Sequence, residues 1–89
     1  MDNTLLQQVR SVVLEHGRLT DSSGLKDDSD LYTLGLTSHA SVAVMLALEA
    51  AFDLEFPDRF LTRQVFESVQ NIARAISELR GDSPAAGAR

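Results

Sequence analysis

Residues 38–52 read SHASVAVMLALEAAF, an uninterrupted run of apolar and small residues with one acid, Glu49. Alanine, leucine and methionine are among the strongest helix formers, and the run contains neither proline nor glycine. We therefore predict a helix over 38–52. The apolar residues recur at helical spacing. The stripe that we expect to face the core consists of Val42, Met45, Leu48 and Phe52, with Leu46 beside it.

Two further helices are predicted on either side of this segment. In residues 3–16 the apolar residues recur at helical spacing with polar residues between them, and Gly17 is well placed to end that helix. Ser68 is a typical N-cap residue before a last helix that runs to about residue 80. The apolar stripes comprise Leu5, Val9, Val12, Val13 and His16 in the first helix, and Val69, Ile72, Ile76 and Leu79 in the last.

The segments between the helices differ in length. Residues 17–36 show no clean period and predict a long loop, in which Asp28–Tyr32 form a helical turn. Loops of about 20 residues are uncommon in compact domains and are usually functional. We expect leucines to attach this loop to the core. Pro57 favours a short third helix over residues 58–61. The loop leucines are Leu25, Leu31, Leu34 and Leu36.

The pattern as a whole predicts an all-α bundle of three main helices plus one short helix, with a long loop between the first two. The folded domain is expected to span residues 1–80. The tail 81–89, GDSPAAGAR, is rich in small residues and is expected to be disordered. There are 89 residues in all, enough for one domain with a modest core.

Composition argues against several classes of function. The chain has no cysteine and only two histidines, so we expect no metal site. Its formal charge is −5, which disfavours nucleic acid as a partner. No stretch approaches the roughly 18 apolar residues of a membrane span. Residues 1–10, MDNTLLQQVR, do not read as a signal peptide, so we expect a cytoplasmic monomer.

The segment from Leu34 to Asp58 resembles the acyl carrier protein family. Members of this family typically have Leu-Gly, two residues, a modified serine, and a helix that ends in Leu-Glu and Phe with Pro-Asp soon after. Here Leu34-Gly35 precedes Ser38 at that spacing, and the later positions agree in type and order. The resemblance covers about residues 3–80. The later matching positions are Leu48-Glu49, Phe52 and Pro57-Asp58.

The resemblance implies a carrier that is not itself an enzyme. A phosphopantetheinyl transferase would attach 4'-phosphopantetheine from coenzyme A to Ser38, and the thiol of this arm would hold cargo as a thioester. The position suits an anionic phosphodiester, because the N–H groups and the dipole at a helix N-terminus favour negative charge. A serine at a helix start is also commonly an N-cap. The local alternatives are Thr37, a plausible N-cap, and Ser41, one turn further on.

Several positions depart from the common family pattern. Thr37 and His39 replace the usual Asp and Leu around the serine, and alanines replace the acids that normally bind basic partner enzymes. We predict a small, apolar partner-binding face instead. Other candidate contacts to a partner or to the arm's phosphate are Thr37, His39, Met45, Leu46, Arg59 and Arg63. The alanines are Ala40, Ala43, Ala50 and Ala51.

The pattern around Ser38, with Phe-Pro-Asp-Arg at 56–59, is similar to a narrower group of free-standing carriers from bacteria related to rhizobia. Some of these are charged with glycine or alanine by truncated homologues of seryl-tRNA synthetase. The resemblance implies an amino acid:carrier protein ligase as partner. The first alternative is a specialised acyl carrier for lipid or polyketide synthesis, served by acyl-transferring enzymes. The second is a helical protein-interaction module without a prosthetic group.

Overall fold

The computed structural model describes residues 3–20 and 24–80, and it is all-α over these ranges. Its elements in chain order are α1 (Asn3–His16), α2 (Ser38–Phe52), the 3-10 helix η1 (Asp58–Phe60) and α3 (Val69–Arg80). The three predicted main helices are therefore confirmed, and the predicted fourth helix is a single 3-10 turn. The tail 81–89 lies outside the described residues.

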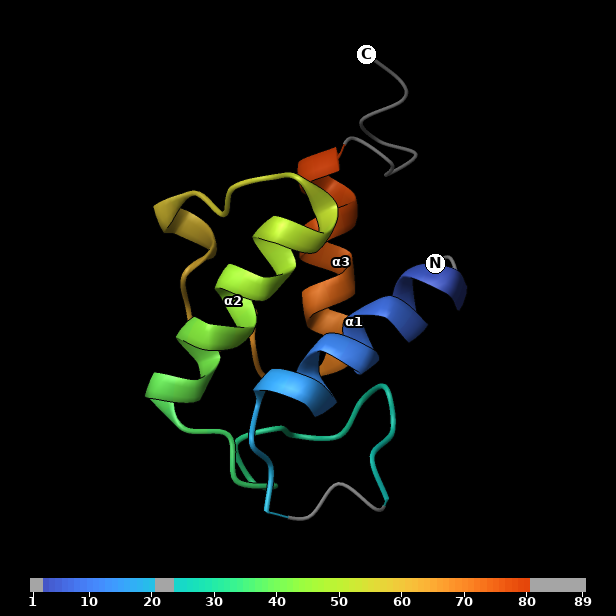
Figure 1. Cartoon of the computed structure of the whole chain (residues 1–89), viewed down its shortest axis with the longest axis vertical. Coiled ribbons are helices and arrows are strands. Elements are labelled where there is room, and N and C mark those ends of the chain that lie inside the picture. The colour runs from blue at the N-terminus through green and yellow to red at the C-terminus, as the bar shows by residue number, and fades with distance from the viewer. Residues whose placement is uncertain (1–2, 21–23, 81–89) are drawn as a thin grey trace.

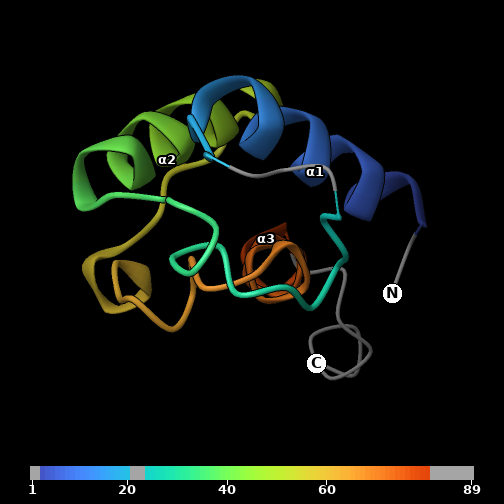
Figure 2. The ribbon, with the colours of Figure 1, turned by 90° about the horizontal axis from the view of Figure 1, so that it is seen from below.

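Helix α1 is the centre of the packing. It contacts both α2 and α3, and Figure 2 shows α1 and α2 lying across α3, which is seen end-on. Val9 and Val13 of α1 are completely buried, as are Ile72 and Ile76 of α3. Each such side chain contributes roughly 1.5–3 kcal/mol of hydrophobic stabilisation before the entropic cost. The predicted inner faces of the first and last helices are confirmed.

The inner face of α2 differs from the predicted one. The buried residues are Ala40, Val44 and Leu48, at i, i+4 and i+8, whereas Val42 and Leu46 are half exposed. Met45 and Phe52 are partly buried against the core. The prediction is confirmed for Leu48 and wrong for Val42 and Leu46, because α2 is apolar on nearly every side. Without a polar face, helical spacing alone does not determine which side points inward.

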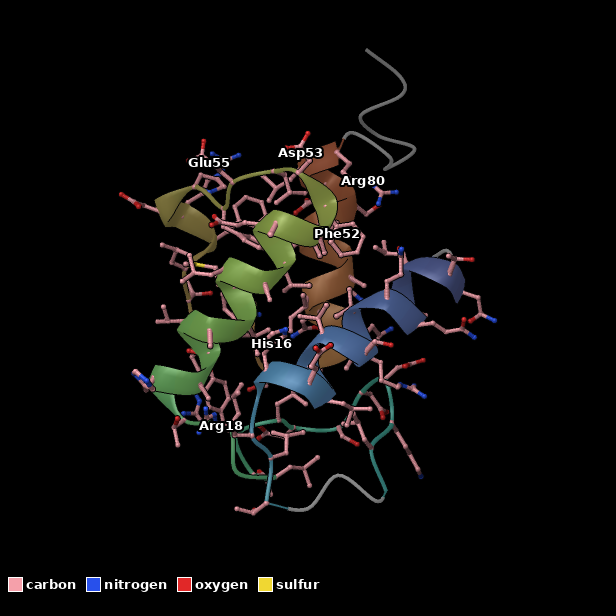
Figure 3. All side chains as sticks on the ribbon, in the orientation of Figure 1. His16, Arg18, Phe52, Asp53, Glu55 and Arg80 are labelled. Carbon is pink, nitrogen blue, oxygen red and sulfur yellow. The ribbon has the colours of Figure 1, made fainter. Side chains whose placement is uncertain are left out.

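Phe52 lies at the edge of the core, at the end of α2. The guanidinium of Arg80, at the end of α3, lies 5.7 Å from the centre of its ring. Figure 3 shows this pair where the two helices end, close to the labelled Asp53. Asp53 ends α2 in the left-handed conformation, and its N–H donates to the Glu49 carbonyl. This C-cap turns the chain toward η1.

The long loop before α2 is attached to α1 and α3. Leu31 is fully buried, and its N–H donates to the Glu67 carbonyl at 2.7 Å. The Asp27 carboxylate pairs with Arg10, and the Asp27 carbonyl accepts the N–H of Gln70 at 2.8 Å. The predicted attachment by leucines holds for Leu31 and Leu36, which are buried, and for Leu25, which is packed against the core.

The helical turn of this loop covers residues 31–35 rather than Asp28–Tyr32. The shift follows from Asp30, whose carboxylate accepts the N–H groups of Tyr32 and Thr33 and so starts the turn. Gly35 ends it at φ +113°, where a side chain would lie within 3 Å of Thr20. Glycine is required here for both reasons. The turn delivers the chain to the first residue of α2.

No helix in the described ranges is long and apolar enough to cross a membrane.

Candidate functional site

Thr37, not Ser38, caps α2. The Thr37 hydroxyl accepts the N–H of Ala40 at 3.0 Å, and its carbonyl accepts the N–H of Ser41 at 2.9 Å. Ser38 is the first residue of the helix and is exposed. Within the described part of the chain, its hydroxyl has no hydrogen-bond partner. The interpretation of Ser38 as a mere cap is therefore wrong, and its hydroxyl is available for chemistry.

The start of α2 presents a positive electrostatic end. Its first turn contains no acidic residue, and the N–H groups of Ser38 and His39 meet no acceptor among residues 3–20 and 24–80. Ser41, the competing serine, is half-buried, and its hydroxyl donates to the Ser38 carbonyl at 2.7 Å. An anion held on Ser38 is consequently favoured by the helix dipole, whereas Ser41 is engaged with the backbone.

Ser38 lines a groove of about 450 Å³. One wall is α2 and the other is the segment between η1 and α3, with the Tyr32 ring contributed by the loop. The lining is largely apolar and includes a single cationic side chain, Arg63. The lining residues are Tyr32, Ser38, Ser41, Val42, Met45, Leu61, Thr62, Arg63 and Phe66.

Arg63 and Tyr32 form a stacked pair in this groove. The guanidinium carbon of Arg63 lies 4.1 Å from the centre of the Tyr32 ring. Burial raises the pKa of Tyr32 above 10.0, and the Arg63 charge opposes the increase. The only ion pair within residues 3–20 and 24–80 joins Arg10 to Asp27. Arg63 thus has no carboxylate partner there.

The predicted site residues do not all lie on one accessible surface. His39, Ala43 and Leu46 are exposed, and Met45 is half-buried in the groove wall. Ala40 is only 4% exposed. Its prediction as a partner contact is wrong, because it is on the i, i+4 stripe that packs into the core. Ala50 and Ala51 are exposed near the other end of α2.

Arg59 and Arg63 occupy different environments. Arg59 stacks over Phe60 at 5.0 Å and is outside the groove, whereas Arg63 lines it. Their sequence contexts are similar, so only the course of the chain after η1 distinguishes them. Tyr32 was also missed as a site residue. Its position two residues after Asp30, in a turn that leads to Ser38, is the signal that points to it.

Glu49, the one acid of α2, has a structural role. Its carboxylate accepts the N–H of Phe56 at 2.9 Å and so fixes the link between α2 and η1. The exposed surface of α2 is therefore nearly free of charge. No three metal-ligating side chains gather in the part of the chain that the structure describes.

These features fit a phosphopantetheine arm. The Ser38 hydroxyl is exposed and unbonded to described residues, the helix start favours a phosphodiester, and a groove begins beside it. Ser38 would hold the phosphate, and the N–H groups of the first turn would face it. When bound, the arm supplies a thiol that can hold an acyl or aminoacyl group as a thioester.

Comparisons with known proteins agree with this description. A family model described as "Phosphopantetheine attachment site" matches residues 7–76. The aminoacyl carrier protein of Agrobacterium fabrum is 45% identical over 65 residues, which are 72% of this chain and 78% of that protein.

Two solved structures are similar in fold as well as in sequence. One is the Agrobacterium tumefaciens carrier protein, in complex with an engineered Bradyrhizobium japonicum glycine:[carrier protein] ligase and ATP. It has a TM-score of 0.78 and 37% identity, over 83% of this chain and 97% of that one. The other is a glycylated carrier protein in complex with the B. japonicum ligase, with a TM-score of 0.67 and 28% identity, over 82% and 99%. Because the family model matches residues 7–76, which are most of this chain, the chain belongs to the carrier proteins of the phosphopantetheine attachment site family.

Proposed function

We propose that the protein is an aminoacyl carrier protein, with 4'-phosphopantetheine attached to Ser38 and an amino acid held as a thioester on the arm. The observation that supports this most is the exposed, unbonded Ser38 hydroxyl at the positive end of α2. It occurs in a chain similar to carriers that were solved with a glycine:[carrier protein] ligase. The chain acts as a substrate of other enzymes and not as an enzyme.

The charging partner is an amino acid:carrier protein ligase, a truncated homologue of seryl-tRNA synthetase. The outer face of α2 supports this assignment. Val42 and Leu46 are 50% and 56% exposed, one turn apart on the same side of the helix, and Ala43 lies beside them. With Glu49 bonded to Phe56, this face offers apolar shape instead of charge. It therefore suits a partner that recognises shape and not an acidic surface.

Amino-acid charging is tested on protein that already bears the arm. The arm-bearing chain is incubated with ATP and the B. japonicum glycine:[carrier protein] ligase, together with glycine or alanine, and its intact mass is measured. A parallel reaction uses an acyl:carrier protein synthetase with short and long fatty acids. We expect addition of one aminoacyl group, and no addition to the Ser38→Ala variant.

The apolar groove supports one second candidate, an acyl carrier for lipid or polyketide synthesis. Its volume of about 450 Å³ and its mainly apolar lining could hold part of an acyl chain. Loading of fatty acids without any loading of glycine or alanine would favour this alternative. Failure to accept the arm from any transferase would instead favour an interaction module.

A further inference from the structure

We propose that Arg63, held in place by the Tyr32 ring, binds the phosphodiester of the arm on Ser38 and directs the arm into the adjoining groove. The inference rests on the proposed function, because it requires the arm to be on Ser38. It concerns a residue outside α2 that has no part in the serine motif. Arg63 would be a positioning residue for the arm.

Geometry is the first support. Ser38 and Arg63 line the same groove, from opposite walls. Ser38 is exposed and lines the groove, so a phosphate attached to its hydroxyl lies next to the groove. An arginine side chain is long and ends in a planar fork of N–H donors that matches phosphate oxygens.

Electrostatics is the second support. Arg63 is the only cationic side chain in the groove lining, and it has no carboxylate partner among the described residues. A guanidinium in a mainly apolar groove has few competing partners, so its attraction to an anion is less screened than in bulk water. A phosphodiester carries a negative charge at any physiological pH.

The stack on Tyr32 provides preorganisation. A guanidinium that lies flat over a ring, here at 4.1 Å, keeps the N–H groups of its edge free to donate. The backbone of Tyr32 is held in place, because its N–H donates to the Asp30 carboxylate in the turn that leads to α2. The stacked pair therefore stands on an ordered turn and lines the same groove as Ser38. Less side-chain entropy is lost on binding when the donor is already oriented.

Arg59 supplies a matched control. It is also an arginine stacked on an aromatic ring, Phe60, but it lies outside the groove. The experiment uses the full chain with and without the arm, as wild type, Arg63→Gln, Arg63→Lys and Arg59→Gln. Intact mass first establishes that each protein carries one arm, and peptide mass places it on Ser38. The readouts are the ³¹P resonance of the arm, the arginine Nε–H resonances, and the melting temperature of each protein with and without the arm.

We expect the Arg63 Nε–H resonance to shift when the arm is added, and that of Arg59 to stay in place. The ³¹P resonance should move in Arg63→Gln, return partly in Arg63→Lys and match the wild type in Arg59→Gln. Adding the arm should raise the melting temperature of the wild type by a few degrees, and less at high salt. Arg63→Gln should lose this increase. Comparing each variant with its own arm-free form cancels any loss of the Tyr32 stack.

Equal ³¹P resonances and equal melting-temperature changes in Arg63→Gln and Arg59→Gln would overturn the inference while leaving the proposed function intact. Absence of the arm from wild-type Ser38 by intact mass would overturn both. The two failures are therefore distinguishable in one sample series.

Discussion

The inner and outer faces of α2 are similar in composition and opposite in environment. Ala40, Val44 and Leu48 are buried against the core, whereas Val42 and Leu46 are half exposed. Both faces consist of aliphatic side chains one turn apart. The inner face stabilises the fold, and in our proposal the outer face is recognised by the ligase. An apolar face left exposed in a small domain is typical of an interaction surface.

Adjacent positions on the two faces allow the sharpest test of this difference. Val44→Glu places a carboxylate where the wild-type side chain is 1% exposed, and an unpaired buried charge costs about 3–5 kcal/mol. That is a large part of the roughly 5–15 kcal/mol that stabilises a domain. We expect Val44→Glu to be unfolded or nearly so by circular dichroism. Ala43→Glu, on the exposed side, should change the free energy of unfolding by less than about 0.5 kcal/mol.

The folded Ala43→Glu variant then probes the partner. A bulky charge on a face recognised by shape should strongly reduce aminoacylation by the ligase. A basic partner enzyme would bind this variant equally well or better, especially at low salt. Undiminished amino-acid charging of Ala43→Glu, or equal stability of the two glutamate variants, would contradict the assignment of the faces.

A second pair compares two leucines of the same helix. Leu48 is fully buried, so Leu48→Ala should destabilise the protein by about 2–5 kcal/mol through lost contacts and a residual cavity. Leu46 is 56% exposed, so Leu46→Ala should cost less than about 0.5 kcal/mol. Urea denaturation measures both values. A reversal of the order would contradict the orientation of α2 described here.

Substitutions on the outer face of α2 should also change the kinetics of charging by the ligase. Truncating one of the few residues that dominate an interface costs more than about 1 kcal/mol of binding, or roughly a 5–10-fold loss of affinity. We expect the double variant Val42→Ala/Leu46→Ala to raise the KM of the ligase for the carrier by at least this factor. The kcat should change less, because the reacting group is carried by the arm. An unchanged KM would show that the ligase docks elsewhere.

The smallest effect compares two neighbours at the start of α2. Thr37→Ala removes the hydroxyl that accepts the Ala40 N–H and should cost about 0.5–2 kcal/mol. Ser38→Ala removes a hydroxyl with no hydrogen bond in the described chain, so its melting curve should overlay that of the wild type. A larger loss of stability for Ser38→Ala than for Thr37→Ala would show that Ser38, and not Thr37, caps α2.

The inner face of a helix could be predicted from the sequence where the helix also has a polar side. Helices α1 and α3 alternate apolar and polar residues, and their limits and inner faces were predicted correctly. Helix α2 was located correctly, but its inner face was predicted only in part, because it lacks a polar side to define which face points inward. Ser38 was identified by spacing and resemblance. The groove was not, because its lining comes from three segments far apart in the sequence, and the long-range contact that joins two of them, from the Leu31 N–H to the Glu67 carbonyl, has no local pattern.

The most direct test of the central claim is the attachment reaction itself. Wild type, Ser38→Ala and Ser41→Ala are each incubated with coenzyme A and a broad-specificity phosphopantetheinyl transferase, and intact mass is measured. All three should show native circular dichroism. We predict one phosphopantetheine on wild type and on Ser41→Ala, and none on Ser38→Ala. Modification that persists in Ser38→Ala and is lost in Ser41→Ala would contradict the account.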